Sequence, residues 1–99
     1  MLFIIHCMDR TGALQDRIDN YDAHRAHLSD TVTTIVLAGP VTAVDAKTPL
    51  GSMFVVDVEG RAEAEAFNRE DPFYKLGVWD RDSIRIHPFL KRRGWLSGY

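Results

Sequence analysis

Arg17, His24 and Asp71 are the residues whose types and spacing best suit chemistry in this chain. Arg17 and His24 are seven positions apart, so on a helix they lie two turns apart and point in nearly the same direction, about 20° from each other. An imidazole can transfer a proton near neutral pH, and a guanidinium can bind an anionic substrate group through its planar fork. The spacing therefore predicts acid–base chemistry on an anion. The alternative is that both side chains lie at the solvent edge of a helix.

Asp71 has two roles that are compatible with each other. It precedes Pro72 and Phe73, which is typical of an N-cap residue followed by proline at the first position of a short helix. Its carboxylate can also orient His24 and stabilise the charged imidazole. Because a carboxylate has two oxygens, one residue can fill both roles. Ser52 can add a hydrogen bond to a substrate, although a serine that opens a strand is commonly structural.

The other candidate groups carry weaker signals. His24 and His27 have a spacing near that of metal ligands, but no Cys or carboxylate set completes a site, so we expect no metal and no cofactor. Cys7 lies within an apolar run and is expected to be an inert core thiol. Three polar residues on strands expected to be neighbours at the centre of the sheet could form a polar spot on one sheet face: His6, Arg85 and His87.

The elements that position these groups follow from the hydrophobic pattern. The predicted elements are a strand over residues 2–8, a helix over 13–29, a strand over 33–38, a strand over 52–58, a helix over 61–68 and a strand over 83–89. Gly39-Pro40 is expected to end the second strand because proline cannot continue the ladder, and residues 41–50 are expected to form a loop. The order β-α-β-β-α-β predicts an α+β, ferredoxin-like fold with an antiparallel four-stranded sheet and both helices on one side.

The predicted strands over residues 2–8 and 52–58 are apolar on both faces. Two helices can cover only one face of the sheet, and a soluble monomer rarely exposes so large an apolar area. A second copy of the chain is the expected cover, which predicts a homodimer through the sheet faces. The alternative cover is a large apolar ligand.

The composition is that of one globular domain. The chain has 99 residues, 45% of them hydrophobic and 26% charged, so we expect a single domain over residues 1–99. The apolar start lacks a basic leader and no stretch approaches the ~20 apolar residues of a membrane span, which together with a single cysteine predicts a cytoplasmic protein with no membrane contact. The net charge of −2 argues against a nucleic-acid partner. Residues 91–99 form a basic, aromatic C-terminal tail.

Several short segments, in their order and spacing, resemble the YciI-like (YCII-related) family over nearly all of the chain. They are the apolar strand ending in Asp9, Arg17 followed by His24 within Ala23–Leu28, the strand end Leu37–Pro40, Gly51-Ser52, Asp71-Pro72-Phe73, Gly77-Val78 and Ile86–Phe89. The resemblance implies the dimeric α/β-barrel version of the ferredoxin-like fold and an active-site pair formed by His24 and Asp71. It also places Arg17 where the family frequently has an arginine.

A related member of that family is a dehydrochlorinase that acts on a chlorinated hydroxyhydroquinone. The resemblance therefore implies elimination or proton transfer on a small oxygenated ring. Arg25 and His27 depart from what the family leads us to expect, as does the longer tail.

The leading interpretation is a cofactor-free enzyme with lyase-, dehydrochlorinase- or isomerase-like activity on a small oxygenated, aromatic substrate. His24 would exchange the proton, Asp71 would fix its tautomer, Arg17 would bind an anionic or phenolate oxygen and Ser52 would add a hydrogen bond. The pocket is predicted between the His24 side of the first helix and the loop that carries Asp71. The alternative is a non-catalytic small-ligand-binding or accessory dimeric module. A third interpretation places the chemistry in a sheet-lined cavity that depends on His6 or Arg85.

Overall fold

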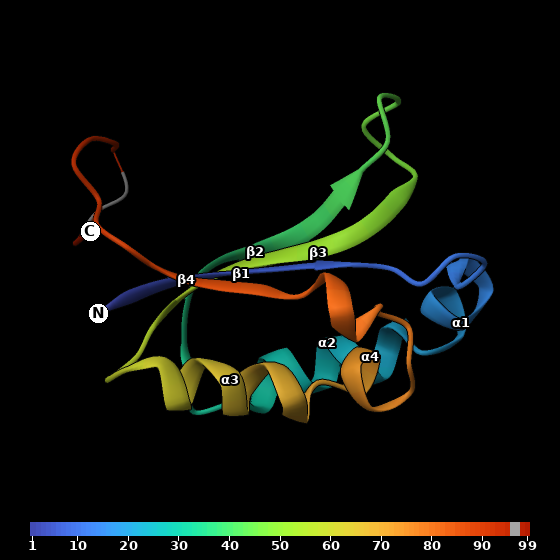
Figure 1. The fold of residues 1–99 in the computed structure, drawn as a ribbon, viewed down its shortest axis with the longest axis horizontal. Helices are drawn as coiled ribbons and strands as arrows, with labels where there is room; N and C mark the ends of the chain where they lie inside the picture. Colours follow the sequence, from blue (N-terminus) through green and yellow to red (C-terminus); the bar gives the residue numbers. More distant parts are fainter. Residues whose placement is uncertain (96–97) are drawn as a thin grey trace.

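A four-stranded antiparallel sheet carries all the helices on one of its faces (Figure 1). The computed structural model describes residues 1–95 and 98–99. The strands are β1 (Leu2–Met8), β2 (Thr34–Thr42), β3 (Pro49–Asp57) and β4 (Arg85–Phe89). They lie in the order β2-β3-β1-β4, and β1 pairs antiparallel with both β3 and β4. This arrangement confirms the predicted α+β, ferredoxin-like fold.

The predicted helix over residues 13–29 is interrupted at Asn20, so that prediction was wrong in its continuity. The helices are α1 (Leu14–Asp19), α2 (Tyr21–Asp30), α3 (Arg61–Glu70) and α4 (Pro72–Lys75), followed by the 3₁₀ turn η1 (Arg81–Ser83). The Asn20 side chain donates to the carbonyl oxygen of Asp16 at 2.9 Å, beside the Asn20 backbone amide, which donates to the same oxygen at 3.1 Å. Asparagine is unfavourable inside a helix because its side chain bonds to nearby backbone groups. The carbonyl oxygen of Asn20 accepts a hydrogen bond from the backbone amide of His24 at 3.1 Å, and the chain continues from there as α2.

Strand β2 continues through Gly39-Pro40 to Thr42, whereas the sequence pattern predicted that it ends there. The reason is the position of β2 at the edge of the sheet, where it pairs with β3 alone. Pro40 is paired with Ser52, and an edge strand tolerates proline because one side of it needs no ladder donor. The predicted loop over residues 41–50 is shortened accordingly, since β3 already begins at Pro49.

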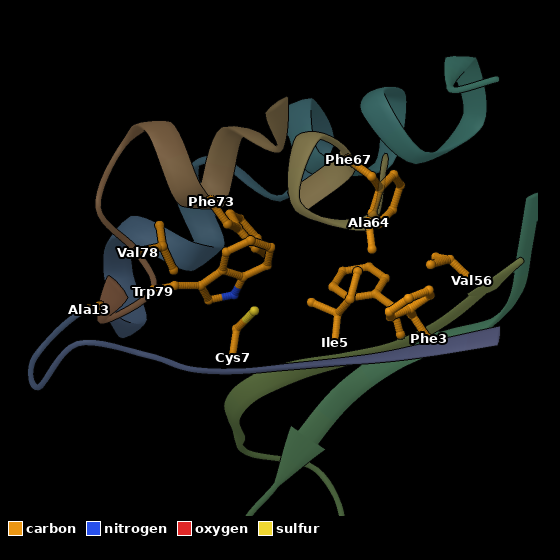
Figure 2. Close-up of a cluster of buried hydrophobic side chains, with 11 residues drawn as sticks. Phe3, Ile5, Cys7, Ala13, Val56, Ala64, Phe67, Phe73, Val78 and Trp79 are labelled. Atoms are coloured by element: carbon orange, nitrogen blue, oxygen red, sulfur yellow. The ribbon is translucent and has the colours of Figure 1, made fainter. Parts of the chain in front are cut away.

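The core lies between the sheet and the helices (Figure 2). Alternate residues of β1 point into it, with Phe3, Ile5 and Cys7 buried. The other buried apolar side chains come from β3, from the helices and from the segment that follows α4: Phe54, Val56, Ala13, Ala64, Phe67, Phe73, Val78 and Trp79. Phe54, Phe73 and Trp79 of this cluster also pack against the candidate site.

Within the residues that the structure describes, no helix lies on the opposite side of the sheet (Figure 1). We call this side the open face; its residues include Leu2, Ile4, His6, Met8, Leu37, Met53, Val55, Arg85 and His87, by strand alternation and register. Across its middle, Val55 lies between Ile4 and Leu37. The expectation of a second apolar face is thus confirmed, while its covering by a second copy of the chain stays a prediction.

None of the helices in the described part of the chain has the length and apolar character that crossing a membrane would demand. The C-terminal tail over residues 91–99 includes residues 96 and 97, which lie outside the described residues.

Candidate active site

His24 and Asp71 form a buried hydrogen-bonded pair, as the sequence predicted they could. Nδ1 of His24 lies 2.9 Å from Oδ1 and 2.8 Å from Oδ2 of Asp71. Asp71 is fully buried and His24 is 8% exposed. Because a carboxylate only accepts hydrogen bonds, Nδ1 is the donor, and the neutral imidazole therefore presents Nε2 as an unprotonated acceptor.

Asp71 also caps helix α4, so the same carboxylate makes the cap and contacts the imidazole of His24. Its Oδ1 accepts from the backbone amide of Phe73 at 2.9 Å, and Pro72 occupies the first turn. The fixed φ of proline suits that position, and the cap satisfies a donor that the helix would otherwise leave free. One carboxylate therefore anchors α4 and holds the imidazole of α2.

Aromatic rings surround the His24 imidazole. Phe73 stacks on it with centroids 4.1 Å apart and planes 6° apart, while Phe54 and Trp79 approach edge-on at 6.2 and 6.4 Å. These contacts and the Asp71 hydrogen bonds leave the ring little freedom to rotate. Nε2 makes no hydrogen bond to any described residue, so it is the ring nitrogen available to a ligand.

Arg17 is buried in a salt bridge and does not lie at a solvent edge. Its Nε donates to Oδ2 of Asp9 at 2.7 Å and its Nη2 donates to Oδ1 at 2.9 Å, a two-point pair of side chains that are 6% and 9% exposed. Nη2 also donates to Oγ of Ser52 at 2.8 Å, and the guanidinium lies 4.7 Å from the Phe73 ring centroid. The pair with Asp9 balances the charge of Arg17 and fixes its direction.

Ser52 connects this salt bridge to the aromatic wall. Its Oγ accepts from Nη2 of Arg17 and from Nε1 of Trp79, the latter at 3.3 Å. With both lone pairs engaged, the hydroxyl hydrogen is left to donate. The position depends on the neighbouring Gly51, because a Cβ there would lie 2.2 Å from the carbonyl oxygen of Cys7 on β1.

These groups line one cavity of about 470 Å³ between the helices and the β2–β3 hairpin. Its walls include Arg17 of α1, His24 of α2, Ser52 of β3 and Pro40 of β2. The volume lies within the ordinary range of small-molecule sites. The location differs from the predicted one, because Asp71 lies behind the imidazole and does not line the cavity.

The remaining candidates lie elsewhere. His6 pairs with Arg85 on the open face. The sequence predicted that the strand carrying Arg85 lies at the centre of the sheet, but β4 is an edge strand. Neither residue lines the cavity that holds His24. Cys7 is fully buried, and burial raises the pKa of its thiol to about 12, so at neutral pH it is a protonated core side chain. Within residues 1–95 and 98–99, no group of His, Cys, Asp and Glu is arranged to hold a metal ion.

Sequence reasoning missed several members of the site. The sequence pattern marks Asp9 only as the end of a strand, although a buried arginine needs an anion and this carboxylate directly follows β1. Trp79 comes from the segment after α4, and Lys47 reaches the cavity from the hairpin. No local pattern identifies either of these two, since their places depend on how distant segments pack.

Together these features define a class of protein: a ferredoxin-like α+β domain in which a buried His–Asp pair opens onto a ligand-sized cavity. The chain belongs to the family of the YCII-related domain, whose profile matches residues 1–89. This confirms the family resemblance that the short motifs suggested.

The relatives cover most of the chain. Protein YciI of Escherichia coli O6:H1 and protein YciI of Shigella flexneri are each 31% identical over 98 residues, spanning 92% of this chain and 98% of theirs. Among solved structures, 5-chloro-2-hydroxyhydroquinone dehydrochlorinase (TftG) of Burkholderia phenoliruptrix AC1100, in complex with 2,5-dihydroxybenzoquinone, is 36% identical. It superposes with a TM-score of 0.79 over 91% of this chain and 94% of that one.

Proposed function

We propose that this protein is a cofactor-free enzyme that uses His24 and Asp71 for general acid–base chemistry on a small oxygenated ring. The observation that carries the proposal is the His24 ring itself: Asp71 holds Nδ1, and Nε2 belongs to a side chain that lines the cavity. A buried carboxylate behind an imidazole fixes the tautomer and stabilises the imidazolium that forms on proton uptake. The likeness to a dehydrochlorinase supports elimination as the reaction class.

In the proposed reaction, Nε2 of His24 removes a proton from the substrate. In an elimination, the electron pair left behind forms a double bond as a leaving group such as chloride departs with its own bonding pair. In an isomerisation, the same imidazolium returns the proton at another atom. Asp71 stays ionised throughout and balances the positive charge on the imidazole.

Arg17 and Ser52 are proposed to bind a substrate oxygen. The Nη1 nitrogen of Arg17 makes no hydrogen bond to the described residues, and the Ser52 hydroxyl is left as a donor. Asp9 balances the charge of Arg17, so Arg17 exerts little net attraction on an anion. What Arg17 and Ser52 offer a phenolate or carbonyl oxygen is therefore directed hydrogen bonds.

The test is turnover of chlorinated hydroxyhydroquinones, followed by chloride release, in wild type, His24→Ala and Asp71→Asn. General acid–base catalysis of this kind is worth about 10²–10⁴-fold, so His24→Ala should lower kcat by that amount. Asp71→Asn should keep the α4 cap, because asparagine is as good an N-cap as aspartate, while losing the carboxylate that receives Nδ1–H. We expect its kcat to fall at least about tenfold, with a changed tautomer in ¹⁵N spectra of His24.

His87→Gln is the matched control, since His87 is an exposed histidine on the edge strand β4. It should retain full activity. If activity were lost on replacing His6 or Arg85 but kept in His24→Ala, the reaction would belong to the open face and the proposal would be wrong. Ligand binding without turnover of any such substrate would instead favour the binding or accessory module.

A further inference from the structure

We infer that the substrate carries a second anionic group, a carboxylate on the ring, which Arg25 and Lys47 bind at the rim of the cavity. The inference rests on the proposed function only in placing the reacting part of the ring against His24. It deepens that function by naming a substrate class: small aromatic carboxylates.

The first support is the charge of the cavity wall. Arg17, Arg25 and Lys47 line it, and none of the described residues that line it is Asp or Glu. Asp9 balances Arg17 and Asp71 faces the imidazole of His24. Arg25 and Lys47 make no ion pair with any described residue, so two uncompensated positive charges remain beside the ligand volume.

The second support is that the Arg25 side chain and the backbone that carries Lys47 are both held in place. The Arg25 guanidinium lies 5.7 Å from the ring centroid of Tyr21, one helical turn before it on α2, and this contact limits its rotamers. Lys47 follows a tight turn that is held by Asp45, whose carboxylate accepts from the amides of Lys47 and Thr48 at 2.9 Å and from the Thr48 hydroxyl. These bonds, the Thr48 hydroxyl first, lower the pKa of Asp45, so the turn is maintained at neutral pH.

The third support is the apolar character of much of the remaining lining. Apolar side chains line the same cavity as the two cations, among them Ile18, Leu28, Pro49 and Phe54. Such a wall suits the faces of an aromatic ring, while isolated charged groups at one side fix its orientation. A single six-membered aromatic ring with a few substituents fits within about 470 Å³.

The experiment compares two probes that differ only by a carboxylate, hydroquinone and 2,5-dihydroxybenzoate. Dissociation constants are measured by calorimetry for wild type, for the double variant Arg25→Met/Lys47→Met and for the control Lys75→Met, an exposed lysine of α4 away from the cavity. In wild type, 2,5-dihydroxybenzoate should bind about tenfold more tightly than hydroquinone at low salt, and the gap should narrow as salt is raised.

The double variant should lose this preference, weakening only the carboxylate probe, by about three- to tenfold. The control should keep it. Equal binding of the two probes by wild type, an unchanged preference in the double variant, or binding of neither probe would each overturn the inference. The preference is measured by binding and should persist in His24→Ala, whereas failure of the proposed function would appear as unchanged kcat in that variant, so the two failures are distinguishable.

Discussion

At the scale of single residues, one oxygen of the Asp71 carboxylate takes part in both the α4 cap and the contact with His24. Its Oδ1 accepts both from the Phe73 amide and from His24. The phenyl ring of that same Phe73 stacks on the imidazole. Any movement of the cap therefore moves the Phe73 ring that packs on the imidazole of His24. This coupling is the reason a substitution to asparagine, which preserves the cap, is more informative than one to alanine.

Cys7 gives a prediction about stability against pH. Burial raises the pKa of its thiol from 9.0 to about 12, so above pH 9 the unfolded chain loses this proton while the folded chain keeps it. The unfolded state then binds fewer protons, and the free energy of unfolding falls as pH rises from about 9 toward 12, by at most about 1.4 kcal/mol per pH unit. Urea unfolding at a series of pH values measures this slope.

The comparison for that slope is Cys7→Ala, in which the thiol contribution is absent. The variant starts from a lower stability because a buried side chain is shortened, so the slopes are compared and not the absolute values. Parallel curves for the two proteins between pH 9 and 10.5 would contradict the assignment.

At the scale of elements, the close approach of β1 and β3 depends on Gly51. A Cβ at this position would lie 2.2 Å from the Cys7 carbonyl oxygen and 3.0 Å from Cα of Met8, which are backbone atoms that cannot turn aside. We expect Gly51→Ala to destabilise the fold by about 1–3 kcal/mol, as overpacking does, measured by urea unfolding.

Gly39→Ala on β2 is the control, because a Cβ there meets nothing within 4 Å. Its stability should change little or rise slightly, since alanine costs less backbone entropy than glycine. An equal loss in both variants would show that glycine is needed for reasons other than the contact between β1 and β3.

Much of this element pattern could be predicted from the sequence, because it depends on local periodicity. The continuous apolar run of β1 and the run of alanine and glutamate in α3 specify their structures by themselves. The break at Asn20 and the continuation of β2 through Pro40 could not, since the first depends on a side-chain hydrogen bond and the second on which strand lies at the edge. His24 and Asp71 were within reach through chemistry and family resemblance, whereas the salt bridge of Arg17 with Asp9 required the fold.

At the scale of the whole molecule, the open face leads us to propose a homodimer in which two sheets pack face to face. Leu37 is 38% exposed and lies beside Val55 across the sheet, and apolar rows of this kind are commonly interfaces. Light scattering should give twice the chain mass of 11.2 kDa. Val55→Asp and Leu37→Asp should each shift the protein to the monomer, because they bury a charge against the partner.

Leu76→Asp serves as the control for this measurement, since Leu76 is an exposed leucine, 55% accessible, at the end of α4 on the helix side. It should leave the dimer intact. A wild-type protein that scatters as a monomer at about 100 µM, a concentration well above the dissociation constants of stable homodimers, would contradict the proposal.

The arrangement of the cavity has a consequence for how this protein can diverge. His24, Asp71, Arg17 and Ser52 are buried and tied to core aromatic rings, so a substitution at any of them also changes contacts within the core. Arg25 and Lys47 also line the cavity but are exposed, one on α2 and one beside the hairpin turn. Mutation can therefore exchange these two residues while the fold and the His24–Asp71 hydrogen bonds persist, which makes these two positions the places to begin when redesigning the protein for a different ligand.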